Sequence, residues 1–123
     1  MIARMAQHEI EKRLREFPAV ALHGARQIGK TTLAREIQRR LGGKYFDLED
    51  QRDQILLSDS HAFFSDHREH LVVIDEAQRM PELFPALRVA IDADRRPGRF
   101  LLLGSASPSL SRQASESLAG ALP

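Results

Sequence analysis

Four short apolar runs along the chain predict β-strands. They cover residues 19–23, 45–48, 71–74 and 100–103. Each is short and lies between glycine, proline or charged residues, as is typical of buried strands. Residues 71–74, Leu-Val-Val-Ile, show no alternation with polar residues. That pattern indicates a parallel strand covered on both faces.

Between these runs, apolar residues recur at a spacing of three or four, which predicts amphipathic helices. The first expected helix covers residues 2–17 and is ended by Pro18, and the second covers 30–41 and is ended by Gly42-Gly43. Shorter helical segments are expected around 55–57 and 61–64. Residues 83–91 mark a further helix, and the last runs from Ser107-Pro108 to Gly120. We expect the Ser- and Ala-rich C-terminal stretch to be the weakest packed segment. Strands that alternate with helices predict an α/β fold with a parallel sheet and crossover helices.

Composition narrows the class of protein. The 123 residues, 42% of them apolar, suit a single domain over 1–123, with an N-terminal helix at 1–17 and a core at 18–120. No apolar run approaches the ~20 residues of a membrane span, and the charged N-terminus lacks the apolar core of a secretory signal. Cysteine is absent, which excludes disulfides and thiolate chemistry. We therefore expect a cytoplasmic protein that does not enter a membrane.

Residues 24–31 read G-A-R-Q-I-G-K-T, which fits the phosphate-binding pattern G-x-x-x-x-G-K-[ST]. The glycines let the backbone turn N–H groups toward phosphate oxygens, Lys30 adds a positive charge for the β- and γ-phosphates, and Thr31 offers a hydroxyl to Mg²⁺. The helix that begins here adds its positive N-terminal end. The predicted nucleotide site comprises Gly24, Ala25, Arg26, Gln27, Ile28, Gly29, Lys30, Thr31 and Thr32.

An acidic pair, Asp75-Glu76, follows the third apolar run. Nucleotide hydrolases place such a pair at a strand end, where the first acid shares the Mg²⁺ shell with the loop Ser/Thr. We predict Thr31 and Asp75 as the metal residues, because Mg²⁺ prefers hard oxygen ligands. Glu76 is the predicted catalytic residue that orients water. The alternative is a solvent-facing acidic pair or a helix N-cap.

Ser105 follows the fourth apolar run, at the strand edge where ligands of α/β sheets bind. We predict that it senses the γ-phosphate or the attacking water, and a helix-capping serine is the alternative. Lys30 completes the predicted catalytic set. His61, His67 and His70 match no zinc spacing, so we expect them to face solvent. No residue is singled out as an arginine finger among Arg26, Arg79, Arg95, Arg96, Arg99 and Arg112.

Taken together, the motifs resemble one family. R-Q-I-G-K-T-T-L, Y-F-D-L-E-D, V-I-D-E-A-Q-R-M-P-E-L-F, R-F-L-L-L-G-S-A-S and E-S-L-A-G look like successive motifs of prokaryotic AAA+-type ATPases with a C-terminal domain of unknown function. The resemblance covers about residues 18–120. It implies a P-loop NTPase three-layer α/β/α sandwich of the additional-strand type, with sheet order 5-1-4-3-2, and it implies ATP and Mg²⁺ as cofactors.

Two departures from this pattern affect the expectations. Ala121 stands where the family usually has an arginine after S-L-A-G, and the chain ends at Pro123. We therefore expect a C-terminally incomplete domain that lacks the last strand, with residues 19–23 at an exposed sheet edge.

Three functions stay open at the sequence level. The first is an ATP-binding and ATP-hydrolysing domain. The second is a nucleotide-binding module without turnover, and the third is a small P-loop kinase. The predicted partner is ATP, together with an unidentified protein or nucleic acid, and an oligomer is possible. The absence of a guanine-specific Asn/Thr-Lys-x-Asp motif mildly favours adenine.

Overall fold

A computed structural model describes residues 2–23, 29–105 and 109–123. Its described strands are β1 (Ala19–His23), β2 (Lys44–Asp47), β3 (Val72–Asp75) and β4 (Phe100–Gly104). They form one four-stranded sheet in the order β1-β4-β3-β2, with every neighbouring pair parallel. The sequence expectation of a parallel α/β sheet is confirmed, and β1 lies at one edge of the sheet, as expected.

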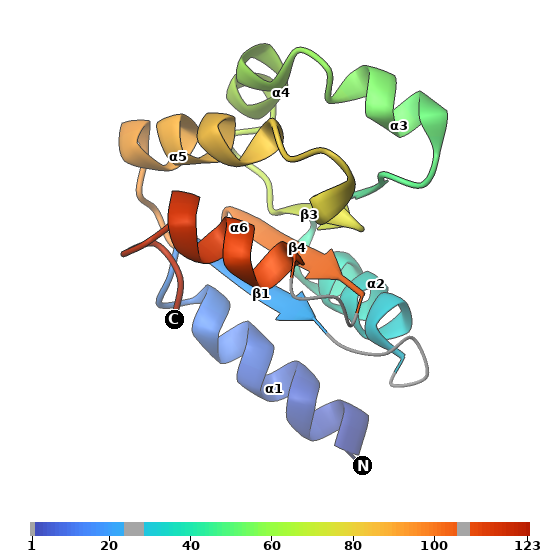
Figure 1. The fold of residues 1–123 in the computed structure, drawn as a ribbon. Helices are drawn as coiled ribbons and strands as arrows, with labels where there is room; N and C mark the ends of the chain where they lie inside the picture. The colour runs from blue at the N-terminus through green and yellow to red at the C-terminus, as the bar shows by residue number, and fades with distance from the viewer. Residues whose placement is uncertain (1, 24–28, 106–108) are drawn as a thin grey trace.

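Helices cover both faces of this sheet (Figure 1). On one face, α1 (Ile2–Leu14) and α2 (Lys30–Leu41) supply Ile10, Leu14, Ala34 and Ile37 to a core shared with Val20, Val73, Leu101 and Leu103. On the other face, the core is formed with α4 (Ser60–Asp66), α5 (Leu83–Ala93) and α6 (Ser109–Ser117). Consecutive residues of β3 and β4 enter opposite cores, which explains why both apolar runs show no alternation.

Two short elements lie outside these layers. Helix α3 (Gln51–Leu56) contributes no buried residue and exposes Ile55 and Leu56. A single 3-10 turn, η2 (Ala77–Arg79), follows β3 directly. The helical segments that the sequence placed around 55–57 and 61–64 correspond to α3 and α4.

Most element boundaries agree with the sequence. Helix α2 covers 30–41 as predicted and ends at Gly42, whose φ of 72° suits a glycine and whose N–H donates to the Gln38 carbonyl. Helix α1 ends at Leu14, so its predicted end at residue 17 was wrong. Pro18 explains the difference, because its ring crowds the carbonyl four residues before it and disfavours helical backbone at Phe17.

The C-terminal segment corrects another expectation. Leu110, Ala114, Leu118 and Ala121 are all buried, so this stretch is well packed. Arg88 and Arg95 donate to the carbonyls of Ala119 and Gly120, and the Ala19 N–H donates to the Ala121 carbonyl. Helix α6 ends at Ser117 rather than at Gly120, and the predicted Ser107-Pro108 cap lies outside the described residues. No helix in the described ranges is long and apolar enough to cross a membrane.

Candidate functional site

The carboxyl ends of the parallel strands meet at one edge of the sheet, beside the start of α2. Gly29 has φ 72°, a left-handed backbone that glycine adopts without strain. Lys30 is the first residue of α2 and is only 5% exposed. Thr31 and Thr32 follow it on the first turn. The other predicted loop residues, Gly24, Ala25, Arg26, Gln27 and Ile28, lie outside the described residues.

Thr31 and Asp75 lie in direct contact, although 44 positions separate them. The Thr31 hydroxyl donates to Asp75 Oδ2 at 3.1 Å. Asp75 ends β3 and is 7% exposed. A polar cavity of about 370 Å³ opens over this pair, lined by Gly29, Lys30, Thr31, Thr32, Arg35, Tyr45, Asp47, Glu49, Asp75 and Glu76.

The Asp75 carboxylate and the Thr31 hydroxyl fit a magnesium ion that is bound together with phosphates. Within the described ranges, no group of three His, Cys, Asp or Glu is arranged to hold a metal ion. One carboxylate and one hydroxyl are too few ligands for a dedicated metal cage. They suit Mg²⁺, which keeps several waters and takes its remaining ligands from nucleotide phosphates.

Glu76 is buried beside the sheet edge and is already hydrogen-bonded. Its Oε2 accepts from Gln78 Nε2 at 2.7 Å and from the Ser105 hydroxyl at 3.2 Å. The Arg79 guanidinium is 3.9 Å from the same oxygen. The structure therefore brings together Glu76 and Ser105, two of the predicted catalytic residues, and adds Gln78 between them.

The end of β4 leaves Gln78 little room. Gly104 precedes Ser105, and a Cβ added at Gly104 would lie 2.8 Å from Gln78 Oε1 and 2.7 Å from Leu110 Cδ2. The amide therefore lies against the glycine backbone, with Nε2 directed at Glu76 and 3.4 Å from Ser105 Oγ. Because Gly104 has no Cβ, the Gln78 side chain can lie between Glu76, after β3, and Ser105, after β4.

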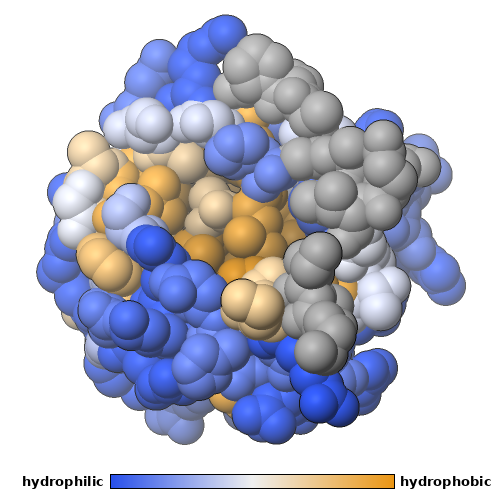
Figure 2. Space-filling model, turned by 90° about the horizontal axis from the view of Figure 1, so that it is seen from below, coloured by the Kyte–Doolittle hydropathy of each residue, from blue (hydrophilic) through white to orange (hydrophobic). Residues whose placement is uncertain are grey.

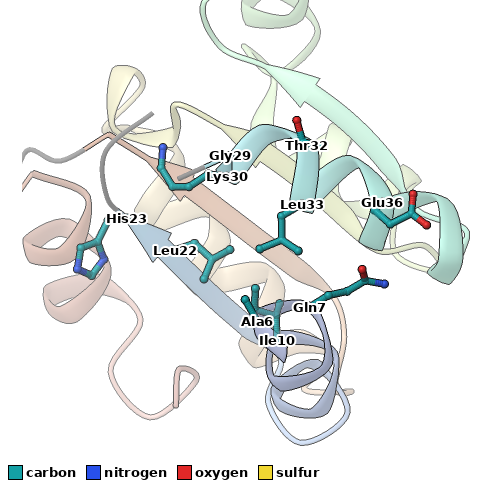
Figure 3. A pocket seen from close by; sticks show the side chains of 10 residues that line it. All are labelled: Ala6, Gln7, Ile10, Leu22, His23, Gly29, Lys30, Thr32, Leu33 and Glu36. Carbon is teal, nitrogen blue, oxygen red and sulfur yellow. The ribbon is translucent and has the colours of Figure 1, made fainter. Parts of the chain in front are cut away.

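A second, larger cavity lies on the other side of Lys30. It has a volume of about 840 Å³ and is lined by Ala6, Gln7, Ile10, Leu22, His23, Gly29, Lys30, Thr32, Leu33 and Glu36. Figure 3 shows Leu22 of β1, Leu33 of α2, and Ala6 and Ile10 of α1 converging from three elements. Helix α1 lies lowest in Figure 1, and the face seen from below carries an apolar hollow with a polar border (Figure 2).

Sequence reasoning missed Tyr45, Arg35 and Gln78. The Tyr45 hydroxyl donates to Asp75 Oδ2, and the Arg35 guanidinium lies 4.0 Å from the centre of the Tyr45 ring. Gln78 is two residues after Glu76, so its proximity was available from the sequence. Tyr45 stands on a predicted strand, but only the pairing of β2 with β3 brings it to Asp75.

The histidines and Arg99, which the sequence also raised as candidates, lie away from this site. His61 and His70 are exposed, as expected, whereas His67 is half-buried and stacks on Phe63 with ring centres 4.2 Å apart. Arg99 is 4% exposed and donates to the carbonyls of Ala90 and Asp94, so it closes the end of α5. Burial lowers the pKa of Arg99.

A family model described as an AAA domain matches residues 16–122. The chain belongs to the AAA domain family. An AAA domain implies a P-loop nucleotide site, which agrees with the position of Lys30 and Thr31 at the start of α2. The resemblance noted from the sequence motifs is thereby confirmed.

Two relatives place this AAA domain within longer proteins. The chain is 47% identical over 117 residues to an uncharacterized protein of Mycobacterium bovis and equally to one of Mycobacterium tuberculosis. Each alignment covers 95% of this chain and 26% of the relative. The chain therefore spans about a quarter of the length of the curated relatives it matches.

Proposed function

We propose that this AAA domain binds ATP together with Mg²⁺ and hydrolyses it. The observation that carries the proposal is the contact between Thr31 and Asp75 beside the buried Lys30, with Glu76 and Ser105 adjacent at the same sheet edge. P-loop hydrolases use this pairing of a loop hydroxyl with a strand-end aspartate.

Each residue has a distinct part in this proposal. Lys30 and the amides of residues 24–29 bind the phosphates, and Thr31 and Asp75 hold the metal ion. When bound, Mg²⁺ would neutralise charge on the phosphate oxygens. Glu76 orients the attacking water, and Ser105 contacts the γ-phosphate or that water. Catalysis then consists of positioning and charge stabilisation.

The larger cavity would take the nucleoside. It borders Lys30 and Thr32, so a nucleotide with its phosphates on the loop would extend its base into this space. Its volume of about 840 Å³ and its aliphatic walls suit a small ligand with a flat apolar ring. Gln7, His23 and Glu36 add polar groups at the border. Adenine as the base follows from the family resemblance.

A binding module without turnover is the second candidate, and the bonding of Glu76 favours it. Glu76 Oε2 accepts from both Gln78 and Ser105. Both hydrogen bonds engage Oε2, so a water must reach Oε1 or replace one of these donors before Glu76 can accept its proton. If neither occurs, the domain binds nucleotide and does not hydrolyse it.

Two variants test the proposal. We expect Lys30→Ala to abolish ATP binding measured by calorimetry, because the charge that faces the phosphates is lost. We expect Glu76→Gln to retain binding and lose phosphate release, because an amide cannot act as a base. Equal ATP affinity in wild type and Lys30→Ala would refute the site.

Phosphate release separates the competing functions. Release from Mg·ATP without an acceptor supports hydrolysis, binding without release supports the module, and strict dependence on an acceptor supports the kinase.

A further inference from the structure

Tyr45 lines the polar cavity and has no role in the function proposed above. It stands on β2, in register with Val73 of β3, two residues before the Asp47–Asp75 pair. Its hydroxyl donates to Asp75 Oδ2, the oxygen that also accepts from Thr31. A neighbouring strand thus supplies a second donor to the carboxylate proposed to hold the metal.

The Tyr45 ring is fixed from two sides. It is partly buried and packs against the core between the sheet and α2. On the same helix, one turn after Thr31, Arg35 stacks its guanidinium 4.0 Å from the ring centre. A tyrosine hydroxyl is protonated at neutral pH, so Tyr45 is the donor in its hydrogen bond to Asp75.

We propose that Tyr45 is a positioning residue that orients Asp75 toward a metal ion bound with the nucleotide. The inference rests on the proposed function. The proposed function assigns one carboxylate, Asp75, to the metal, so the orientation of that carboxylate matters more than it would in a cage of several acids. A carboxylate held by a fixed donor loses less conformational entropy when it binds the ion. Donors behind a metal ligand typically contribute about 10–100-fold in affinity.

The chain offers a conservative variant and a matched control. Tyr45→Phe keeps the ring, its packing and its contact with Arg35 but removes the donor to Asp75. Lys44→Ala removes an exposed cation from the same strand and leaves the Tyr45 hydroxyl and the cavity lining in place. If the Tyr45 ring has only a packing role, both variants bind metal as wild type does, whereas a positioning role predicts that Tyr45→Phe alone weakens metal binding.

The first measurement is Mn²⁺ binding in the presence of a non-hydrolysable ATP analogue. The electron paramagnetic resonance signal of free Mn²⁺ reports how much of the ion is bound. We expect Tyr45→Phe to weaken Mn²⁺ binding about tenfold, with metal-free nucleotide affinity unchanged. Lys44→Ala should stay within about twofold of wild type. Wild-type Mn²⁺ affinity in Tyr45→Phe overturns the inference and leaves the proposed function intact. No joint binding of Mn²⁺ and nucleotide by wild type overturns both.

The second measurement uses wild type and covers the case in which Tyr45→Phe fails to fold. Tyr45 is the single tyrosine of the chain, which has no tryptophan, so near-ultraviolet emission reports this site. Emission from a phenol depends on the acceptor of its hydroxyl proton. We expect Mg²⁺ added to the nucleotide complex to change this emission, because a bound cation lowers the basicity of Asp75, the acceptor of the Tyr45 hydroxyl proton. Unchanged emission at saturating Mg²⁺ overturns the inference.

Discussion

Glu76 is the one non-glycine residue with a positive φ in the part of the chain that the structure describes, at 56°. Left-handed backbone costs a residue with a Cβ about 1–3 kcal/mol when it is imposed by its surroundings. Here the surroundings are β3 on one side and the η2 turn on the other. In this conformation the Glu76 carboxylate accepts from the Ser105 hydroxyl. The strained residue is therefore the proposed catalytic one.

Replacement of Glu76 by glycine tests this account at the residue scale. We expect Glu76→Gly to leave the free energy of unfolding unchanged or to raise it, because relief of about 1 kcal/mol of strain offsets the lost hydrogen bonds. The matched control is Glu76→Ala, which loses the same hydrogen bonds but keeps the Cβ and therefore the strain. Chemical denaturation measures both. A loss in Glu76→Gly as large as in Glu76→Ala would contradict the strain argument.

The sequence predicted those parts of the site that are contiguous in the chain. The Lys30-Thr31 pair begins the helix after the first apolar run, and the Asp75-Glu76 pair stands at the end of the third run, so the chain path alone places both pairs at the carboxyl edge of the sheet. Tyr45 and Ser105 reach their partners across 30 and 29 positions, to Asp75 and Glu76 respectively. Such contacts depend on strand order and register, which a single sequence does not encode locally.

At the scale of elements, α1 is joined to α2 by a buried carboxylate. Glu11 is 6% exposed and accepts from Arg40 Nε at 2.9 Å and Nη2 at 3.3 Å, and from Gln7 Nε2 at 3.0 Å. Burial raises the pKa of Glu11, but the donors from Arg40 and Gln7 outweigh it, and the net pKa is lowered below its ordinary value of 4.5. Helix α1 also forms one wall of the larger cavity, so this link supports that wall.

The link predicts a specific pH dependence of stability. A lowered folded-state pKa contributes stability above the unfolded-state value, and this contribution is lost as pH falls through the folded-state pKa. We expect Arg40→Ala to melt several degrees below wild type at pH 7. The difference should shrink below about pH 4.5.

Thermal unfolding by circular dichroism from pH 7 to pH 3 measures this effect. Arg39→Ala is the control, because Arg39 pairs with the exposed Glu36 and such pairs contribute little. A difference between wild type and Arg40→Ala that does not change with pH would contradict the assignment to Glu11.

Element boundaries were predicted best where backbone chemistry alone decides them. Gly42 ends α2 through its left-handed backbone, a purely local effect. The packing of α6 could not be predicted in this way. Its serines and alanines look weak in sequence, yet Leu110, Ala114 and Leu118 fill one face against the sheet. Burial of a small residue depends on how closely its neighbours approach, and that is a property of the tertiary fold.

At the scale of the whole molecule, the candidate site connects three parts of the fold. Lys30 and Thr31 begin α2, Asp75 ends β3, and Ser105 follows β4. The apolar cores behind them lie on opposite faces of the sheet. A ligand that contacts all three parts binds the folded state alone, because the unfolded chain does not bring them together. Its binding energy therefore adds to the stability of the whole domain.

This connection predicts a thermal shift that is largest when nucleotide and metal are both present. At about 100 times the dissociation constant, a ligand stabilises by about 2.7 kcal/mol, which corresponds to a rise in Tm on the order of 10 °C for a domain of this size. We expect Mg·ATP to produce such a shift and ATP without metal a smaller one. Mg²⁺ alone should produce none, because one carboxylate and one hydroxyl do not hold the ion without phosphates.

Lys30→Ala should remove the shift with Mg·ATP while its own melting stays cooperative. An equal rise with Mg²⁺ alone would mean that the metal binds independently of the nucleotide, contrary to the site proposed for Thr31 and Asp75.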